Sequence, residues 1–116
     1  MNKAMWLALA LALTALLAPA SEAAMSCNTV QNALYPCVSY VLYGGAVVPP
    51  ACCQGIKGLY KQASATADRQ AVCSCLKSVA QSAPQAAIAN AAALPGKCGV
   101  TIPYKISPST NCANVR

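Results

Sequence analysis

Residues 52–75 read CCQGIKGLYKQASATADRQAVCSC, a pair of adjacent cysteines followed after a long gap by a Cys-Ser-Cys triplet. Four more cysteines flank this stretch and complete the set of eight: Cys27, Cys37, Cys52, Cys53, Cys73, Cys75, Cys98 and Cys112. An even number of cysteines behind an apolar leader indicates a disulfide framework rather than free thiols. The sequence therefore predicts a small, helical, covalently cross-linked domain.

The first 23 residues have the three parts of a secretory signal peptide. Lys3 supplies the positive start, and residues 5–17 form an uncharged segment rich in leucine and alanine. Ser21 and Ala23 are small residues at the two positions that a signal peptidase recognises. We therefore expect a signal peptide at 1–23.

A membrane anchor is the alternative interpretation of this leader. A spanning helix needs about 20 apolar residues, and here Pro19 and Glu22 interrupt the run. We therefore expect one mature domain at 24–116, soluble and secreted. A domain of this size has a limited core, so the cross-links must supply part of its stability.

The composition excludes most catalytic mechanisms and metal sites. The chain has no histidine, the usual base for a serine or cysteine nucleophile, and past the leader Asp68 is its only acidic residue. There is no C-x-x-C pair for zinc and no glycine-rich phosphate loop. We expect a binding protein without catalytic residues, metal or other cofactor.

The net charge is +6, which favours contact with anionic lipid surfaces or acidic polymers. The alternative is that dispersed lysines only keep a small apolar protein soluble. Past the leader there is no Trp or Phe to stack on bases, and the charges are not clustered. We expect no binding of nucleic acid.

Apolar periodicity predicts four helices. The first covers residues 28–43 with a bend at Pro36, and the second runs from the Pro49-Pro50 pair to about residue 63. We expect Thr66 to cap the third helix, with Asp68 in its first turn. The fourth covers residues 84–94 and ends before Pro95-Gly96, and an irregular tail follows from Cys98 to Arg116.

The chain resembles the plant non-specific lipid-transfer proteins of type 1 over essentially its whole length. The Cys52-Cys53 pair and the 73–75 triplet mark the eight-cysteine superfamily, and a polar residue within the triplet is typical of type 1. The family motif P-Y-x-I-S matches fully at 103–107. The motif T/S-x-x-D-R/K matches at 65–69 except that alanine replaces its leading hydroxyl residue.

This resemblance implies an all-α fold: a four-helix, disulfide-stapled bundle with an irregular C-terminal tail around a hydrophobic tunnel. Spacing alone does not give the pairing of the cysteines, because eight of them allow 105 connectivities. The resemblance implies the bridges Cys27–Cys75, Cys37–Cys52, Cys53–Cys98 and Cys73–Cys112.

The resemblance also implies a monomeric carrier of fatty acids and other acyl lipids, such as phospholipids and galactolipids. Such a carrier makes transient contact with membrane surfaces and transfers lipid between them, in cutin or wax deposition or in defence. Its place would be the cell wall, or apoplast. The alternatives within the superfamily are a protease or amylase inhibitor, although no inhibitory loop stands out, and a membrane-active antimicrobial protein.

Arg69 and Tyr104 are the predicted contacts of the lipid head group. An anionic group beside Arg69 would also meet the positive N-terminus of the third helix. We expect Asp68 to orient Arg69. The alternative for Arg69 is a surface arginine paired with Asp68 or with a carbonyl of the tail, and the alternative for Tyr104 is an ordinary half-buried tyrosine.

Small aliphatic side chains are predicted to line the tunnel, although the sequence leaves open whether they enclose a cavity or fill a plain core. If they hold an acyl chain, each buried methylene contributes about 0.8 kcal/mol, so affinity should rise with chain length. The predicted lining residues are Val38, Ile56, Leu59, Val72, Leu76, Val79, Ile88, Leu94, Val100, Ile102 and Ile106.

Overall fold

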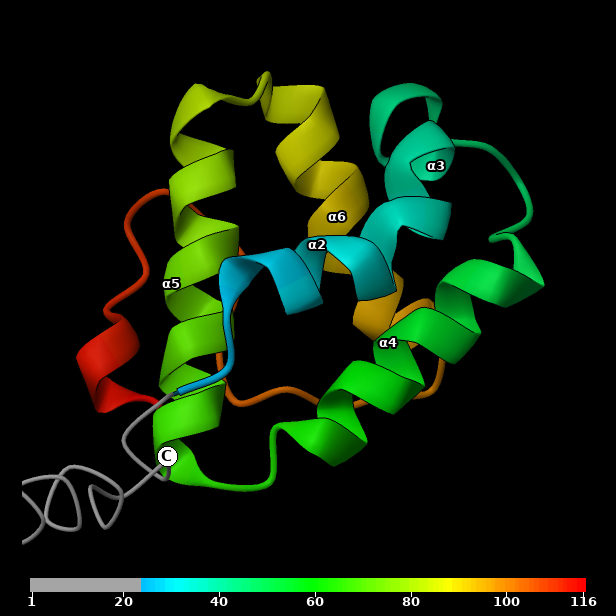
Figure 1. The fold of residues 1–116 in the computed structure, drawn as a ribbon. Coiled ribbons are helices and arrows are strands. Elements are labelled where there is room, and N and C mark those ends of the chain that lie inside the picture. Colours follow the sequence, from blue (N-terminus) through cyan, green and yellow to red (C-terminus); the bar gives the residue numbers. More distant parts are fainter. Residues whose placement is uncertain (1–23) are drawn as a thin grey trace, which may run out of the picture.

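The structure is a computed structural model that describes residues 24–116, and in that range it is all-helical (Figure 1). The predicted signal peptide at 1–23 lies outside the described residues. The prediction of an all-helical fold cross-linked by disulfides is confirmed.

The first predicted helix is divided at Pro36. Helix α2 (Cys27–Leu34) begins after Ser26, whose side-chain oxygen accepts a hydrogen bond from the Thr29 N–H at 3.3 Å. Because proline has no N–H to donate, the chain tightens there into the 3₁₀ turn η2 (Tyr35–Cys37). It continues as α3 (Val38–Tyr43), which ends at Gly44 in a left-handed conformation, with φ +68°.

The next two helices begin close to the predicted positions. Helix α4 (Pro50–Gln62) opens with proline in its first turn, where the missing N–H costs nothing. Helix α5 (Thr66–Ser82) begins at Thr66 itself, whereas Thr66 was expected to be the cap that precedes the first helical residue. Ala65, and not Thr66, occupies the N-cap position, so the expected side-chain cap is wrong and no side chain takes its place.

Helix α6 (Gln85–Lys97) continues through Pro95, so the predicted end before this proline is wrong. Two hydrogen bonds beyond the proline close the helix. The Val100 N–H donates to the Pro95 carbonyl at 2.8 Å, and the Gly99 N–H donates to the Gly96 carbonyl at 3.1 Å. Gly99 has a φ of +75°. This is a Schellman motif, which satisfies the last carbonyls of the helix. Pro95 lies in the last turn, so its missing N–H removes only one intrahelical hydrogen bond.

Four disulfides join the pairs that the resemblance implied: Cys27–Cys75, Cys37–Cys52, Cys53–Cys98 and Cys73–Cys112. Because Cys52 and Cys53 are neighbours on α4, one helix is tied both to η2 and to the end of α6. The other two bridges both hold α5, one to α2 and one to the 3₁₀ turn η3 (Cys112–Asn114).

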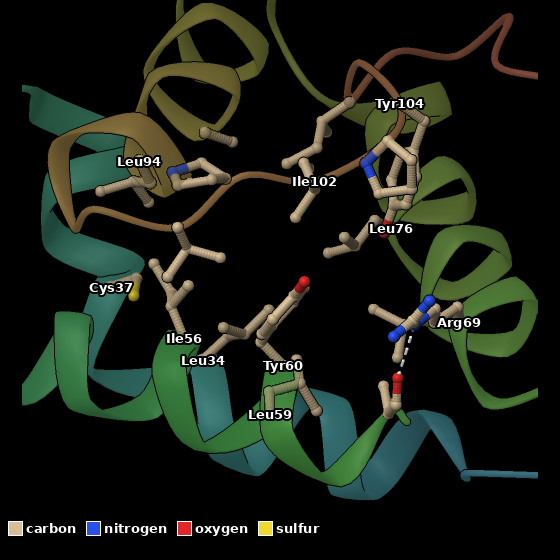
Figure 2. Close-up of a pocket in the computed structure, with 17 residues that line it drawn as sticks. Leu34, Cys37, Ile56, Leu59, Tyr60, Arg69, Leu76, Leu94, Ile102 and Tyr104 are labelled. Atoms are coloured by element: carbon tan, nitrogen blue, oxygen red, sulfur yellow. Dashed lines mark hydrogen bonds between the residues drawn. The ribbon is translucent and has the colours of Figure 1, made fainter. Parts of the chain in front are cut away.

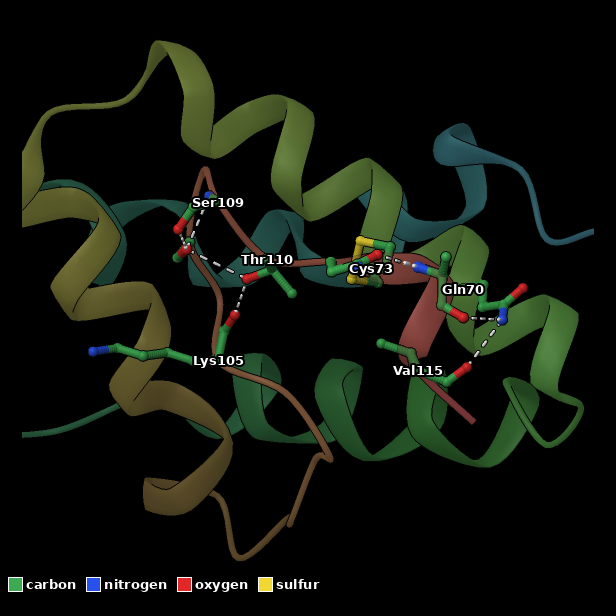
Figure 3. Close-up of a disulfide and its surroundings, with 10 residues drawn as sticks. Gln70, Cys73, Lys105, Ser109, Thr110 and Val115 are labelled. Carbon is green, nitrogen blue, oxygen red and sulfur yellow. Dashed lines mark hydrogen bonds between the residues drawn. A yellow bond between two sulfur atoms is a disulfide. The ribbon is translucent and has the colours of Figure 1, made fainter.

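The C-terminal tail returns across the molecule from α6 to α5 (Figure 1). At its end Gln70 donates from Nε2 to the carbonyls of Ala113 and Val115, at 3.2 and 3.0 Å (Figure 3). These bonds lie beside the Cys73–Cys112 bridge, and Val115 is buried. The tail is therefore irregular, as predicted, and the bridge and these hydrogen bonds fix it in place.

The helices pack closely in the pairs α2 with α4, α2 with α5, α3 with α6, and α4 with α6. Asn90 strengthens one of these pairs by donating from Nδ2 to the Val41 carbonyl at 3.0 Å. Helices α5 and α3 lie on opposite sides of α2 (Figure 1). The buried residues form two clusters, one around Cys37, Ile56 and Leu94 and one around Val30 and Val72.

Candidate functional site

Two pockets lie between the helices. The first, the tail pocket, is bounded by α4, α5, the end of α6 and the tail, and has a volume of about 110 Å³ (Figure 2). The second, the α3 pocket, is bounded by α2, α3, α5 and α6 and has a volume of about 620 Å³. The α3 pocket has the size of a small-molecule site, whereas the tail pocket is narrower.

The two pockets are adjacent and have part of their apolar lining in common. Side chains from five segments belong to both linings: Leu34, Cys37, Leu76, Ala91 and Ile106. The tail pocket is lined by members of both buried clusters: Ile56 and Leu94 of one, and Leu59 and Val72 of the other. The question that the sequence left open is answered: these side chains enclose a cavity.

Every predicted lining residue belongs to one pocket or the other. The tail pocket alone contains Ile56, Leu59, Val72, Leu94, Val100 and Ile102. The α3 pocket alone contains Val38, Val79 and Ile88. Leu76 and Ile106 lie in the shared wall.

Sequence reasoning missed three notable members of the linings. Tyr60 lies one helical turn after Ile56 on α4, so helical spacing could have identified it, and its ring enters the tail pocket (Figure 2). Leu34 follows the buried Val30 at the same spacing. Ala91 gives no such signal, because alanine is common on both buried and exposed helix faces and only the tertiary structure places it in the shared wall.

Arg69 lines the tail pocket near its mouth, and its guanidinium group is held by main-chain oxygens. Nε donates to the Ala63 carbonyl at 2.9 Å, and Nη1 donates to the main-chain oxygen of Arg116 at 3.2 Å (Figure 2). The alternative of a bond to the tail is therefore present in the structure. Asp68 accepts from the Met25 N–H at 3.2 Å, so it anchors the N-terminal segment and does not orient Arg69 as expected.

Tyr104 lines the same pocket from the tail side and is half-buried. Burial raises the pKa of its phenol above the ordinary value of 10.0, because removal from water penalises the phenolate. The hydroxyl therefore remains protonated at neutral pH and can donate a hydrogen bond. Arg69 and Tyr104 thus place polar groups at one end of an otherwise aliphatic space.

Within residues 24–116, no group of His, Cys, Asp and Glu side chains is arranged to hold a metal ion. In the same range, no helix has both the length and the apolar character needed to cross a membrane.

A model of the protease inhibitor/seed storage/LTP family matches residues 27–112. The chain belongs to this family. One relative, the non-specific lipid-transfer protein of Prunus avium, is 54% identical over 95% of this chain and 93% of its own length. The prediction of a non-specific lipid-transfer protein is confirmed.

Solved structures of related lipid-transfer proteins include complexes with lipid. Non-specific lipid transfer protein 1 from barley, in complex with lysophosphatidylcholine, is 39% identical and superposes with a TM-score of 0.71. The match covers 79% of this chain and 100% of the barley chain. The wheat protein, complexed with two molecules of phospholipid, is 41% identical over 78% of this chain and 100% of its own, with a TM-score of 0.69.

Proposed function

We propose that this protein is a secreted carrier that binds acyl lipids in the joined pockets and transfers them between membranes. The observation that best supports this function is the mainly apolar lining that connects the tail pocket to the α3 pocket through Leu76 and Ile106. Such a lining offers an acyl chain apolar contacts in both pockets. Lipid-bound relatives from barley and wheat support the same function.

We further propose that Arg69 and Tyr104 bind the lipid head group. Arginine has five N–H donors, of which the bonds to Ala63 and Arg116 use two, so three remain for a ligand. A carboxylate or phosphate at the mouth of the tail pocket would accept from these donors and from the Tyr104 hydroxyl. The acyl chain would then extend toward the α3 pocket.

The family also includes protease inhibitors, but an inhibitor acts through an exposed loop and needs no cavity. The two apolar pockets therefore favour the carrier. For secretion the support is the sequence of residues 1–23, with its positive start, apolar segment and small residues before the expected cleavage site.

The test is a displacement titration on the secreted protein with all four bridges intact. A fluorescent fatty acid is bound first and is displaced by unlabelled saturated fatty acids of increasing length. At about 0.8 kcal/mol for each buried methylene, affinity should rise by up to roughly fourfold per carbon until the pockets are filled. Absence of binding, or affinity independent of chain length, would contradict the proposed function.

A further inference from the structure

Large exposed apolar side chains gather at the mouth of the α3 pocket. Within residues 24–116, four of them line this pocket: Tyr35 (76% exposed), Val38 (45%), Leu42 (54%) and Val79 (58%). We call these four residues the apolar rim. Single exposed apolar residues are ordinary on protein surfaces, but a group of them that lines one pocket indicates a binding surface.

The other mouth differs in character. Of the large exposed apolar residues, only Tyr60 lines the tail pocket, where the polar groups of Arg69 and Tyr104 also lie. The two pockets therefore present different surfaces to the surroundings. The mouth of the α3 pocket is apolar, whereas the mouth of the tail pocket carries the guanidinium group of Arg69 and the hydroxyl group of Tyr104.

Charge also distinguishes the rim. No charged residue lines the α3 pocket. Asp68, the only acidic residue in 24–116, lies in the first turn of α5, whereas Val79 lies near the end of that helix. At 1.5 Å per residue the two are separated by about 16 Å along the helix axis. The rim can therefore approach an anionic lipid surface without placing a carboxylate against it.

We propose that the apolar rim enters the acyl layer of a bilayer surface, and that lipids pass between bilayer and protein through the mouth of the α3 pocket. This inference rests on the lipid-transfer function proposed above. A lipid bilayer is the partner that fits this surface best, because acyl chains can contact the exposed rim and also enter the pocket that the rim residues line. The mouth at Arg69 and Tyr104 then faces water.

The first experiment places a tryptophan at one position at a time in the secreted protein: Leu42→Trp on the rim, Tyr60→Trp at the other mouth and Val47→Trp as a control. Val47 is 77% exposed and lines neither pocket. Secreted wild-type protein is the blank. The only tryptophan of the chain, Trp6, lies in the expected signal peptide at 1–23, which secretion removes. The probe is a vesicle of phosphatidylcholine and phosphatidylglycerol with brominated acyl chains, which quench tryptophan fluorescence on contact.

The docking signal is the part of the quenching that disappears when the vesicles are removed by centrifugation, since lipid carried in the pockets continues to quench afterwards. We expect this part to be large at position 42 and small at 47 and 60. Quenching at position 42 that is no greater with vesicles present than after their removal would report carried lipid alone and would overturn the docking inference. Equal or stronger quenching at position 47 or 60 would overturn it as well.

A second measurement uses the partition of the protein onto the same vesicles without bromine. Because membrane binding scales with the apolar area that is buried, replacing Leu42 and Val79 together by serine should lower the partition coefficient about tenfold. Val47→Ser should leave it unchanged, and an equal loss in both variants would overturn the inference. Binding of a fluorescent fatty acid by wild-type protein in vesicle-free buffer tests the proposed function separately.

Discussion

Arg69 Nε donates a hydrogen bond of 2.9 Å to the carbonyl oxygen of Ala63, the residue that caps the C-terminal end of α4. This carbonyl lies where a helix leaves its last oxygens without internal donors. Together with the bond from Nη1 to Arg116, it joins α4, α5 and the end of the tail at the mouth of the tail pocket. Arg69 thus has a structural role in addition to the ligand contact that we propose.

Arg69→Ala should reveal both roles. Loss of the two hydrogen bonds should lower the free energy of unfolding by about 1 kcal/mol, since the side chain is only partly buried. Loss of the cation should weaken palmitate binding more than binding of hexadecanol, which has the same chain without a carboxylate. Displacement titrations with the two ligands measure the difference, and an equal loss for both would mean that Arg69 acts on structure alone.

Gly55 is predicted to be intolerant of alanine. A Cβ atom there would overlap the carbonyl oxygen of Ala33, where α2 crosses α4. The two helices would have to separate, at a cost of about 1–3 kcal/mol in the free energy of unfolding. Urea unfolding with intact disulfides measures this change.

Gly58, on the same helix, is the matched control. It is exposed, and a Cβ atom there meets nothing within 4 Å. Gly58→Ala should therefore stabilise the protein by up to about 1 kcal/mol through helix propensity alone. Similar effects of the two substitutions would show that the α2–α4 crossing is not as close as described.

Ala91→Phe should divide the cavity, because Ala91 lies in the wall that both pockets share. Short fatty acids should still bind in one pocket, whereas long ones should lose roughly fourfold in affinity for every methylene that no longer fits. Ala93→Phe is the control, since Ala93 is exposed on α6 and lines neither pocket. A parallel loss for all chain lengths in the Ala91 variant would contradict a continuous cavity.

Tyr104 should titrate above pH 10. Burial raises the pKa of its phenol in the folded protein, so its contribution to stability is complete below pH 10 and is lost as pH rises through the folded-state value. The difference in absorbance at alkaline pH between wild type and Tyr104→Phe isolates this one phenol. A midpoint at or below 10 would place the side chain in water rather than against the pocket.

Much of this fold could be predicted because its determinants are local or covalent. Proline and glycine at positions 36, 44 and 50 define helix ends through their own backbone chemistry. Pro95 was misleading because a proline in the last turn of a helix removes only one intrahelical hydrogen bond. The end of α6 is defined further along the chain, by the hydrogen bonds of Gly99 and Val100.

The residues that line the site could be predicted from the sequence, but the presence of a cavity between them could not. Helical spacing identified aliphatic residues that share an inward face, yet the same pattern describes a filled core. What separates the two outcomes is the distance of α5 from α4 and α6, which is a property of the tertiary structure. For the same reason the position of Ala91 in the shared wall could not be inferred from the sequence.

The pattern of disulfides has a mechanical consequence. Two bridges join η2, α4 and α6 into one covalent unit, and the other two join α2, α5 and η3 into a second. No bridge in residues 24–116 connects α5 directly to α4 or α6 across the tail pocket. Across this pocket α5 and α4 are held by packing and by hydrogen bonds such as that from Arg69 to Ala63, and not by a covalent bond. The width of the pocket can therefore adapt to acyl chains of different shape while every cross-link stays intact.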